Sequence, residues 1–229
     1  MEQRVLGRTG RTVSVVGLGT WQLGEGWGGV REEDAFAVLD TAVAEERIAA
    51  YAVSVRTCEE ALTAIARPGT ASVQIVLNPF RLKPLREVLP AAAEAGVGII
   101  ARVPLASGLL SGKYTKDTVF QQDDHRTYNR HGEVFDRGET FSGVDFESGV
   151  EAAAEFGELA PQGATPAQTA LRWIIQQPGV TTVIPGARSR DQARLNAAAA
   201  ALPPLPDATL EAVRDLYDRR IRRQIHHRW

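Results

Sequence analysis

Hydrophobic and polar positions follow two different periods along most of this chain, and they alternate in a regular order. Short runs rich in β-branched residues have the composition of buried strands, and the stretches between them place apolar residues at helical spacing. The predicted strands are residues 51–55, 72–77, 97–103 and 181–184. The predicted helices are residues 32–45, 58–66, 85–95, 148–159, 165–177, 191–201 and 207–220. This alternation predicts a parallel α/β architecture.

The N-terminal end departs from that rhythm. Two short alternating segments, residues 4–6 and 12–15, flank turn residues 7–10, which predicts a β-hairpin. A short apolar strand is expected at residues 16–20, followed by a loop rich in Gly and Trp.

Several boundaries have specific signals. Thr165 followed by Pro166 is typical of a helix start, and Gly96 is expected to end its helix as a C-cap. A long polar segment, about residues 107–146, interrupts the alternation and is expected to be a surface loop.

Composition narrows the class of protein. The 229 residues include 26 basic and 28 acidic side chains, so no nucleic-acid partner is expected, and the basic run at 219–223 is interpreted as a solvated helix end. The single cysteine, Cys58, excludes a disulfide within the chain. No apolar run approaches the ~18 residues that cross a bilayer, so no membrane partner is expected and the cytoplasm is the predicted location.

Four segments, taken in order, resemble the aldo/keto reductases. They are Leu6-Gly-Arg-Thr-Gly10 with Gly17-Leu-Gly-Thr-Trp21, then Tyr51-Ala-Val-Ser-Val55, then Val103-Pro-Leu-Ala-Ser-Gly-Leu-Leu-Ser-Gly-Lys113, and finally Val183-Ile-Pro-Gly-Ala-Arg188 with Gln192 and Asn196. The resemblance implies one domain over residues 1–229 with the (β/α)8 TIM-barrel fold. Residues 1–45 would hold the hairpin, first strand and first helix, and residues 46–229 the C-terminal half-barrel.

The resemblance also implies that the barrel is incomplete. The segment at 16–20 resembles the first barrel strand, and the four later strands resemble the fifth to eighth. Residues 42–45 run almost directly into the strand at 51, and each absent βαβ unit would take ~30 residues. Strands two to four are therefore expected to be missing, unless the distance between Glu45 and Glu46 greatly exceeds the ~3.8 Å of bonded Cα atoms.

The missing strands bear on catalysis. Members of the family reduce carbonyls with NADPH, using a Tyr as general acid together with a Lys, an Asp and a His from strands two to four. The three lysines and four histidines of this chain fall in loops or in the tail, and Tyr51 begins a strand. We assign no catalytic residue. Three interpretations stay open: an NADP(H)-dependent reductase of aldehydes and ketones, a catalytically inactive NADP(H)-binding relative or interaction protein, and a non-functional deletion product.

The cofactor half is expected to remain. By resemblance, Ser54 and Gln74 face the nicotinamide carboxamide. Pro104, Leu105, Ser107, Leu109, Ser111 and Lys113 wrap the pyrophosphate, and Gly186, Ala187, Arg188, Gln192 and Asn196 hold the adenosine and its 2′-phosphate. Gly-rich turns and helix N-termini bind phosphate through backbone N–H groups. Arg188, with Arg190 and Arg194 in reserve, favours NADP(H), whereas Gly186, Ala187 and Gln192 replace the family's frequent Lys, Ser and Arg and keep NAD(H) as the alternative. Thr20 and Trp21 are expected to line the pocket of a small carbonyl substrate, and a packing role for Trp21 is the alternative.

Other chemistry has weaker support. Gly17 and Gly19 suggest a Rossmann fingerprint, but the third glycine position is Gln22. Neither Ser107 nor Ser111 lies in a G-x-S-x-G nucleophile motif. The acidic and His residues of the long loop match no standard zinc spacing, so a solvated loop, lying over the cofactor as a lid, is favoured and no metal is expected. They are Asp123, Asp124, His125, His131, Asp136 and Glu139.

An incomplete barrel would leave one face of its sheet uncovered. Val53, Val73, Ile99 and Val183, or the residues that alternate with them, would line that face. Parallel sheets are normally buried on both faces, so a homo-oligomer or a partner chain is expected to cover it.

Overall fold

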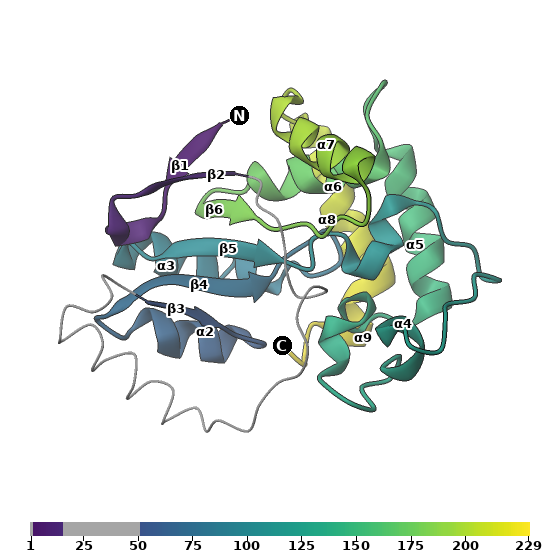
Figure 1. Ribbon diagram of the computed structural model, residues 1–229, viewed down its shortest axis with the longest axis horizontal. Helices are drawn as coiled ribbons and strands as arrows, with labels where there is room; N and C mark the ends of the chain where they lie inside the picture. The colour runs from purple at the N-terminus through teal and green to yellow at the C-terminus, as the bar shows by residue number, and fades with distance from the viewer. Residues whose placement is uncertain (1, 16–50) are drawn as a thin grey trace.

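A four-stranded parallel sheet forms the centre of the molecule (Figure 1). The computed structural model describes residues 2–15 and 51–229. The strands are β3 (Tyr51–Ser54), β4 (Thr70–Val76), β5 (Gly98–Arg102) and β6 (Val180–Val183), and they pair in that order. The four strands predicted after residue 50 are confirmed, and so is their parallel arrangement.

Helices connect the strands, as the alternation predicts. The longer ones are α2 (Cys58–Ile65), α3 (Val88–Ala95), α5 (Phe146–Glu158), α6 (Pro166–Ile175), α7 (Arg190–Ala198) and α8 (Asp207–Leu216). Short helical turns occupy Gly7–Thr9, Lys83–Leu85, Ala106–Ser111 (η4), His125–Tyr128 (α4), Arg137–Glu139 (η5), Phe141–Gly143 (η6) and Ala199–Ala201. Helix α3 begins at Val88 and not at the predicted residue 85, because residues 83–85 form a separate 3-10 turn.

The predicted helix boundaries have the expected caps. Thr165 accepts a hydrogen bond from the backbone N–H of Gln168, whose side chain reaches back to Thr165, and Pro166 is the first helical residue. Gly96 ends α3 with φ 67°, in the left-handed region that favours glycine. Local sequence therefore determines these ends without help from distant residues.

The two faces of the sheet differ in burial. Val73, Ile99 and Val183 are completely buried and belong to the core that α2, α3 and α6 complete. Ser54, Gln74 and Ile100 alternate with that set and are not buried. The less buried face of the sheet is therefore the one that carries Ser54, Gln74 and Ile100, because Val73, Ile99 and Val183 pack against the helices. This face corresponds to the interior of a closed barrel.

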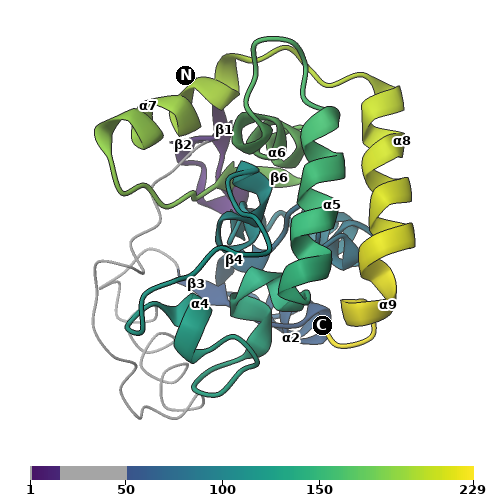
Figure 2. The same cartoon turned by 90° about the vertical axis from the view of Figure 1, so that its right-hand side faces the viewer.

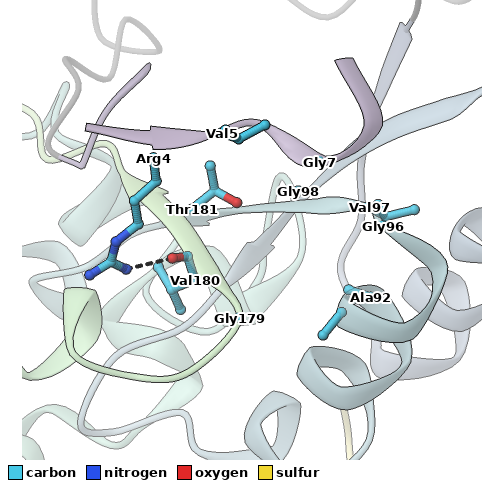
Figure 3. Close-up of a pocket in the computed structure, with 11 residues that line it drawn as sticks. Arg4, Val5, Gly7, Ala92, Gly96, Val97, Gly98, Gly179, Val180 and Thr181 are labelled. Carbon is cyan, nitrogen blue, oxygen red and sulfur yellow. Dashed lines mark hydrogen bonds between the residues drawn. The ribbon is translucent and has the colours of Figure 1, made fainter. Parts of the chain in front are cut away.

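The N-terminal hairpin closes the amino ends of the strands. Strands β1 (Gln3–Val5) and β2 (Thr12–Ser14) are antiparallel, which confirms the predicted hairpin. Arg8 donates to the carbonyls of Pro68 and Ala95 at 2.8 Å each, and Arg4 donates to the carbonyl of Val180 at 2.7 Å. A hollow of about 300 Å³ is lined by residues of the hairpin and of the strand ends. Figure 3 shows these residues, with Arg4 bonded to the carbonyl of Val180.

The first described segment ends beside β6. The backbone N–H of Val183 donates to the carbonyl of Val15 at 2.8 Å. The chain thus leaves the hairpin along the outer edge of β6, where a first barrel strand would pair with an eighth. The predicted strand 16–20, the predicted helix 32–45, Thr20, Trp21 and the junction of Glu45 and Glu46 lie outside the described residues.

The C-terminal helical segment is longer than predicted. Helix α8 continues through a π-helical stretch, Tyr217–Ile221, into α9 (Arg222–Ile225), so the predicted end at residue 220 was wrong. Helices α5 and α8 lie side by side (Figure 2), and Arg219 and Arg220 pair with Glu155 of α5. Two arginines of the basic run thus pair with a neighbouring helix, and their side chains remain exposed, in agreement with a solvated helix end. Within residues 2–15 and 51–229, no helix combines the length and apolar character that crossing a bilayer requires.

Candidate functional site

Two polar side chains meet where β3 and β4 approach their carboxyl ends. Ser54 and Gln74 are partners in the parallel register, and Gln74 Nε2 lies 3.4 Å from Ser54 Oγ. Ser54 is exposed and Gln74 is half-buried. Both lie on the face opposite the helices, so an amide and a hydroxyl are presented together to the former barrel interior.

The turn after β5 is held in an unusual backbone conformation. Val103, Ala106 and Ser107 have φ values of 49°, 48° and 54°, in the left-handed region that costs a non-glycine residue ~1–2 kcal/mol. The Ser107 hydroxyl donates to the carbonyl of Glu139 at 3.1 Å and accepts from the N–H of Phe141 at 3.0 Å. These bonds tie the turn to a distant loop segment, which offsets the local strain. Strain of this kind is often found at ligand sites.

A buried amide links the same two segments. Asn78, two residues after the end of β4, donates from Nδ2 to the carbonyl of Val103 and to Ser142 Oγ, both at 2.8 Å. Phe141 and Ser142 are themselves left-handed, with φ values of 53° and 58°. Sequence reasoning did not single out Asn78. The available signal was a polar residue placed directly after a run of buried strand residues, where barrel proteins carry functional side chains.

Arg102 is a further residue of the site that was not singled out from the sequence. It ends β5 on the same face as Ile100, and its side chain is only 12% exposed. Its guanidinium forms an ion pair with Glu139 and donates from Nη2 to the carbonyl of Val55 at 2.8 Å. Among the described residues, no hydrogen-bond partner faces its buried Nε. A charged residue inside an otherwise apolar strand was the signal that could have revealed it.

The turn after β6 is shaped by its own side chains. Ser189 caps α7 by accepting the N–H of Gln192 at 3.2 Å, and Gln192 Oε1 accepts the N–H of Arg188 at 2.6 Å. Asn196 Nδ2 donates to the carbonyl of Gly186 at 3.2 Å. Gln192 and Asn196 therefore stabilise the turn, while the side chain of Arg188, 71% exposed, extends from it.

Asp124 of the long loop connects this turn to the one after β5. Its carboxylate lies 3.6 Å from the Arg188 guanidinium and also pairs with Arg126, which in turn contacts the Tyr114 hydroxyl. The Tyr114 hydroxyl donates to the carbonyl of Ser107 at 3.3 Å. The path from Ser107 through Tyr114, Arg126 and Asp124 to Arg188, which we call the loop network, is continuous.

The electrostatics of the loop network favour its charged form. Burial alone would raise the pKa of Asp124, but hydrogen bonds from the side chain and backbone of Arg126, and its charge, lower that pKa to about 2. Burial raises the pKa of Tyr114. Asp124 is only 10% exposed, so the expectation of a solvated loop was wrong at this residue, because two arginines pair with its carboxylate.

The remaining predicted residues surround these turns. Pro104 and Leu109 are buried, and Leu109 packs against Gly149, where an added Cβ would approach Leu109 Cδ1 to 2.8 Å. Leu109 can therefore offer a ligand only its backbone. Leu105 is half-buried, Ser111 Oγ donates to the carbonyl of Gly108 at 2.6 Å, and Lys113 is exposed. Gly186 and Ala187 are half-buried.

The family assignment follows from a comparison with known proteins. Residues 47–218 match the model of the aldo/keto reductase family. The chain belongs to the aldo/keto reductase family. Its carboxyl-end turns and parallel strands therefore belong to a TIM barrel of this type, in which β3 to β6 correspond to the fifth to eighth strands.

Individual relatives agree with the assignment. The chain is 32% identical over 151 residues to aldo-keto reductase str7 of Strobilurus tenacellus, covering 64% of this chain and 42% of the relative. It is 36% identical over 102 residues to L-glyceraldehyde 3-phosphate reductase of Escherichia coli O157:H7, covering 44% and 28%. A glycerol dehydrogenase structure from Gluconobacter oxydans aligns with a TM-score of 0.62 and 28% identity, over 80% of this chain and 53% of that one. The chain thus spans less than half the length of these curated relatives.

Metal and thiolate chemistry have no evident place in the described site. Among residues 2–15 and 51–229, no three His, Cys, Asp or Glu side chains are grouped to hold a metal ion. Burial raises the pKa of Cys58 to about 11, so this aldo/keto reductase keeps its thiol protonated near neutral pH.

Proposed function

We propose that this aldo/keto reductase binds NADP(H) across the carboxyl ends of β3 to β6 and serves the reduction of an aldehyde or ketone. The observation that carries the proposal is the loop network. It joins the turn proposed for the pyrophosphate to the arginine proposed for the 2′-phosphate, although these segments are about 80 residues apart in sequence. A dinucleotide is a long ligand, so the separate turns that bind its two ends must be held in fixed positions relative to each other.

Each end of the dinucleotide has groups of suitable chemistry. Ser54 and Gln74 offer a hydroxyl and an amide that match the donor and acceptor of a carboxamide. At the other end, Arg188 stands next to the N-terminus of α7, and both favour phosphate. Arg188 is the better candidate for selecting NADP(H) over NAD(H), because its side chain, 71% exposed, extends from the turn that leads into α7.

Bound NADPH would supply the hydride for carbonyl reduction. The residues of this chain would bind the cofactor, orient its nicotinamide and exclude water from it. Reduction also requires a proton donor for the carbonyl oxygen. We assign no donor among the described residues, and the donor is proposed to come from the strands that complete the barrel, either in this polypeptide or supplied by another chain.

A fluorescence titration of the full chain with NADPH and NADH tests the binding step. We expect NADPH to bind more tightly than NADH, and Arg188→Ala to weaken NADPH by about tenfold, since a charge-assisted pair contributes ~1.4 kcal/mol or more. NADH affinity should not change. Arg214→Ala, at an exposed position of α8, is the matched control. Failure of the wild-type chain to bind either dinucleotide would refute the proposal.

Turnover separates reduction from binding. NADPH absorbance is followed with 4-nitrobenzaldehyde as a generic substrate. Consumption that depends on the aldehyde supports reductase activity. Binding without turnover would indicate a family member that holds the dinucleotide but does not reduce carbonyls by itself.

A further inference from the structure

The side chain of Trp229 is buried beneath the long loop. It follows α9 and is 5% exposed, and its indole Nε1 donates to Asp136 Oδ1 at 3.0 Å. The Arg81 guanidinium lies over the indole, 3.9 Å from the ring centroid. Arg81 is itself 3% exposed, and burial lowers its pKa to about 10, which leaves it charged near neutral pH. Cation–π pairs that are desolvated in this way are stronger than exposed ones.

The loop is built to receive this indole. Asp136 also accepts the N–H of Gly138 at 2.7 Å, which caps η5. A Cβ on Gly138 would lie 2.9 Å from Trp229 Cε2, and one on Gly143 would lie 2.7 Å from Trp229 Cζ3. Only glycine leaves room for the ring at these two positions. We call residues 136–143, which contact the indole at both ends, the clasp.

The clasp also contacts the turn proposed for the pyrophosphate. Between the two glycines, the carbonyl of Glu139 and the N–H of Phe141 both bond to the Ser107 hydroxyl. The Glu139 carboxylate pairs with Arg102 at the end of β5. Trp229 and Ser107 thus contact the same short segment. Because Ser107 is held at φ 54°, its conformation depends on bonds from the clasp.

We propose that Trp229 is a positioning residue for cofactor binding: its indole fixes the clasp, and the clasp holds Ser107 and its turn in the conformation that receives the pyrophosphate. This inference rests on the proposed function for its effect on affinity. Its effect on the order of the turn does not depend on any ligand.

Trp229→Ala is compared with wild type in two measurements. Hydrogen exchange should accelerate at residues 104–111 and 136–143 and stay unchanged in α2 and α3. NADPH affinity should fall by about tenfold, while far-UV circular dichroism is retained. Trp229→Phe keeps an aromatic ring beside Arg81 but loses the hydrogen bond to Asp136. Its hydrogen exchange and its NADPH affinity should therefore lie between those of wild type and those of Trp229→Ala. His227→Ala, exposed and two residues away, is the matched control.

A double-mutant cycle with Ser107→Ala makes the test specific. If Trp229 acts through Ser107, the two substitutions should weaken NADPH binding by much less together than the sum of their separate effects. A purely structural role for the tryptophan would give additive effects. If Trp229→Ala does not fold, Trp229→Phe carries the test, and wild-type exchange and affinity in that variant would overturn the inference.

Failure of the two proposals can be told apart. A wild-type chain that binds no dinucleotide defeats the proposed function, and exchange at residues 104–111 still decides whether Trp229 orders the turn. A wild-type chain that binds NADPH, with Trp229→Ala binding equally well, defeats the inference alone.

Discussion

The two ends of the sheet are built in opposite ways. At the amino ends, the hairpin covers the ends of the strands through close backbone contact at Gly7 and through arginines bonded to carbonyls. At the carboxyl ends, the turns carry buried cations and strained backbone. Among the described residues, all five non-glycine residues with left-handed φ lie there, and they are Val103, Ala106, Ser107, Phe141 and Ser142. The comparison indicates that the amino end serves stability, whereas the carboxyl end, where the dinucleotide is proposed to bind, holds strained backbone and buried charge.

The largest expected effect tests the amino end. Gly7→Ala should destabilise the fold by roughly 3 kcal/mol, because its Cβ would overlap the backbone N of Gly98 and approach the Ala71 carbonyl oxygen to 2.6 Å, at φ 50°. Urea unfolding measures the loss. Gly10→Ala is the control: φ is 68° but the space around it is open, so only about 1 kcal/mol should be lost. Equal losses at the two positions would show that contact with the sheet contributes little.

A smaller effect is expected at the carboxyl end. Ser107→Ala removes two hydrogen bonds and keeps the left-handed strain, and should destabilise the fold by about 1–2 kcal/mol. Ser107→Gly loses the same bonds but relieves the strain, so it should recover about 1 kcal/mol. The denaturant midpoints of the two variants show whether the turn at residue 107 is strained. If Gly and Ala are equally destabilising, the turn is not strained and the contrast between the ends weakens.

The smallest expected effect is a pH dependence. Burial lowers the pKa of both His125, beside Asp124, and His226, which lies 2.9 Å from the Tyr217 hydroxyl. The unfolded chain would take up these protons near pH 6.5, while the folded chain resists them. Stability should therefore be present above pH 6.5 and fall as the pH drops toward the lowered values.

Thermal melts across this range measure the pH effect. In a variant carrying His125→Gln and His226→Gln, the slope below pH 6.5 should flatten. Asp124 also contributes stability, because its pKa in the folded chain is about 2 and its ordinary pKa is 3.8. That contribution is lost only as the pH falls from 3.8 toward 2, well below the range in which the histidines titrate. An unchanged slope in the double variant would assign the pH dependence to other groups.

Much of the framework was predictable from local sequence. The strand at 72–77, the capping of the helix after Thr165 and the end of a helix at Gly96 depend on residues within a few positions of each other. The resemblance of the segments from Val103 and Val183, taken together, was enough to indicate the family. The face of the sheet that stays less buried was left undecided, because alternation alone does not say which set of side chains meets the helices.

The strands, the helix caps, the family and the segments proposed for the dinucleotide could all be inferred from the order of residues along the chain. Three contacts could not be inferred in this way: Asp124 with Arg188, Arg102 with Glu139, and Trp229 with Asp136, 93 residues away. Hydrogen-bonding and hydrophobic periods act over a few residues, whereas buried charges and indoles find their partners only when distant turns pack together.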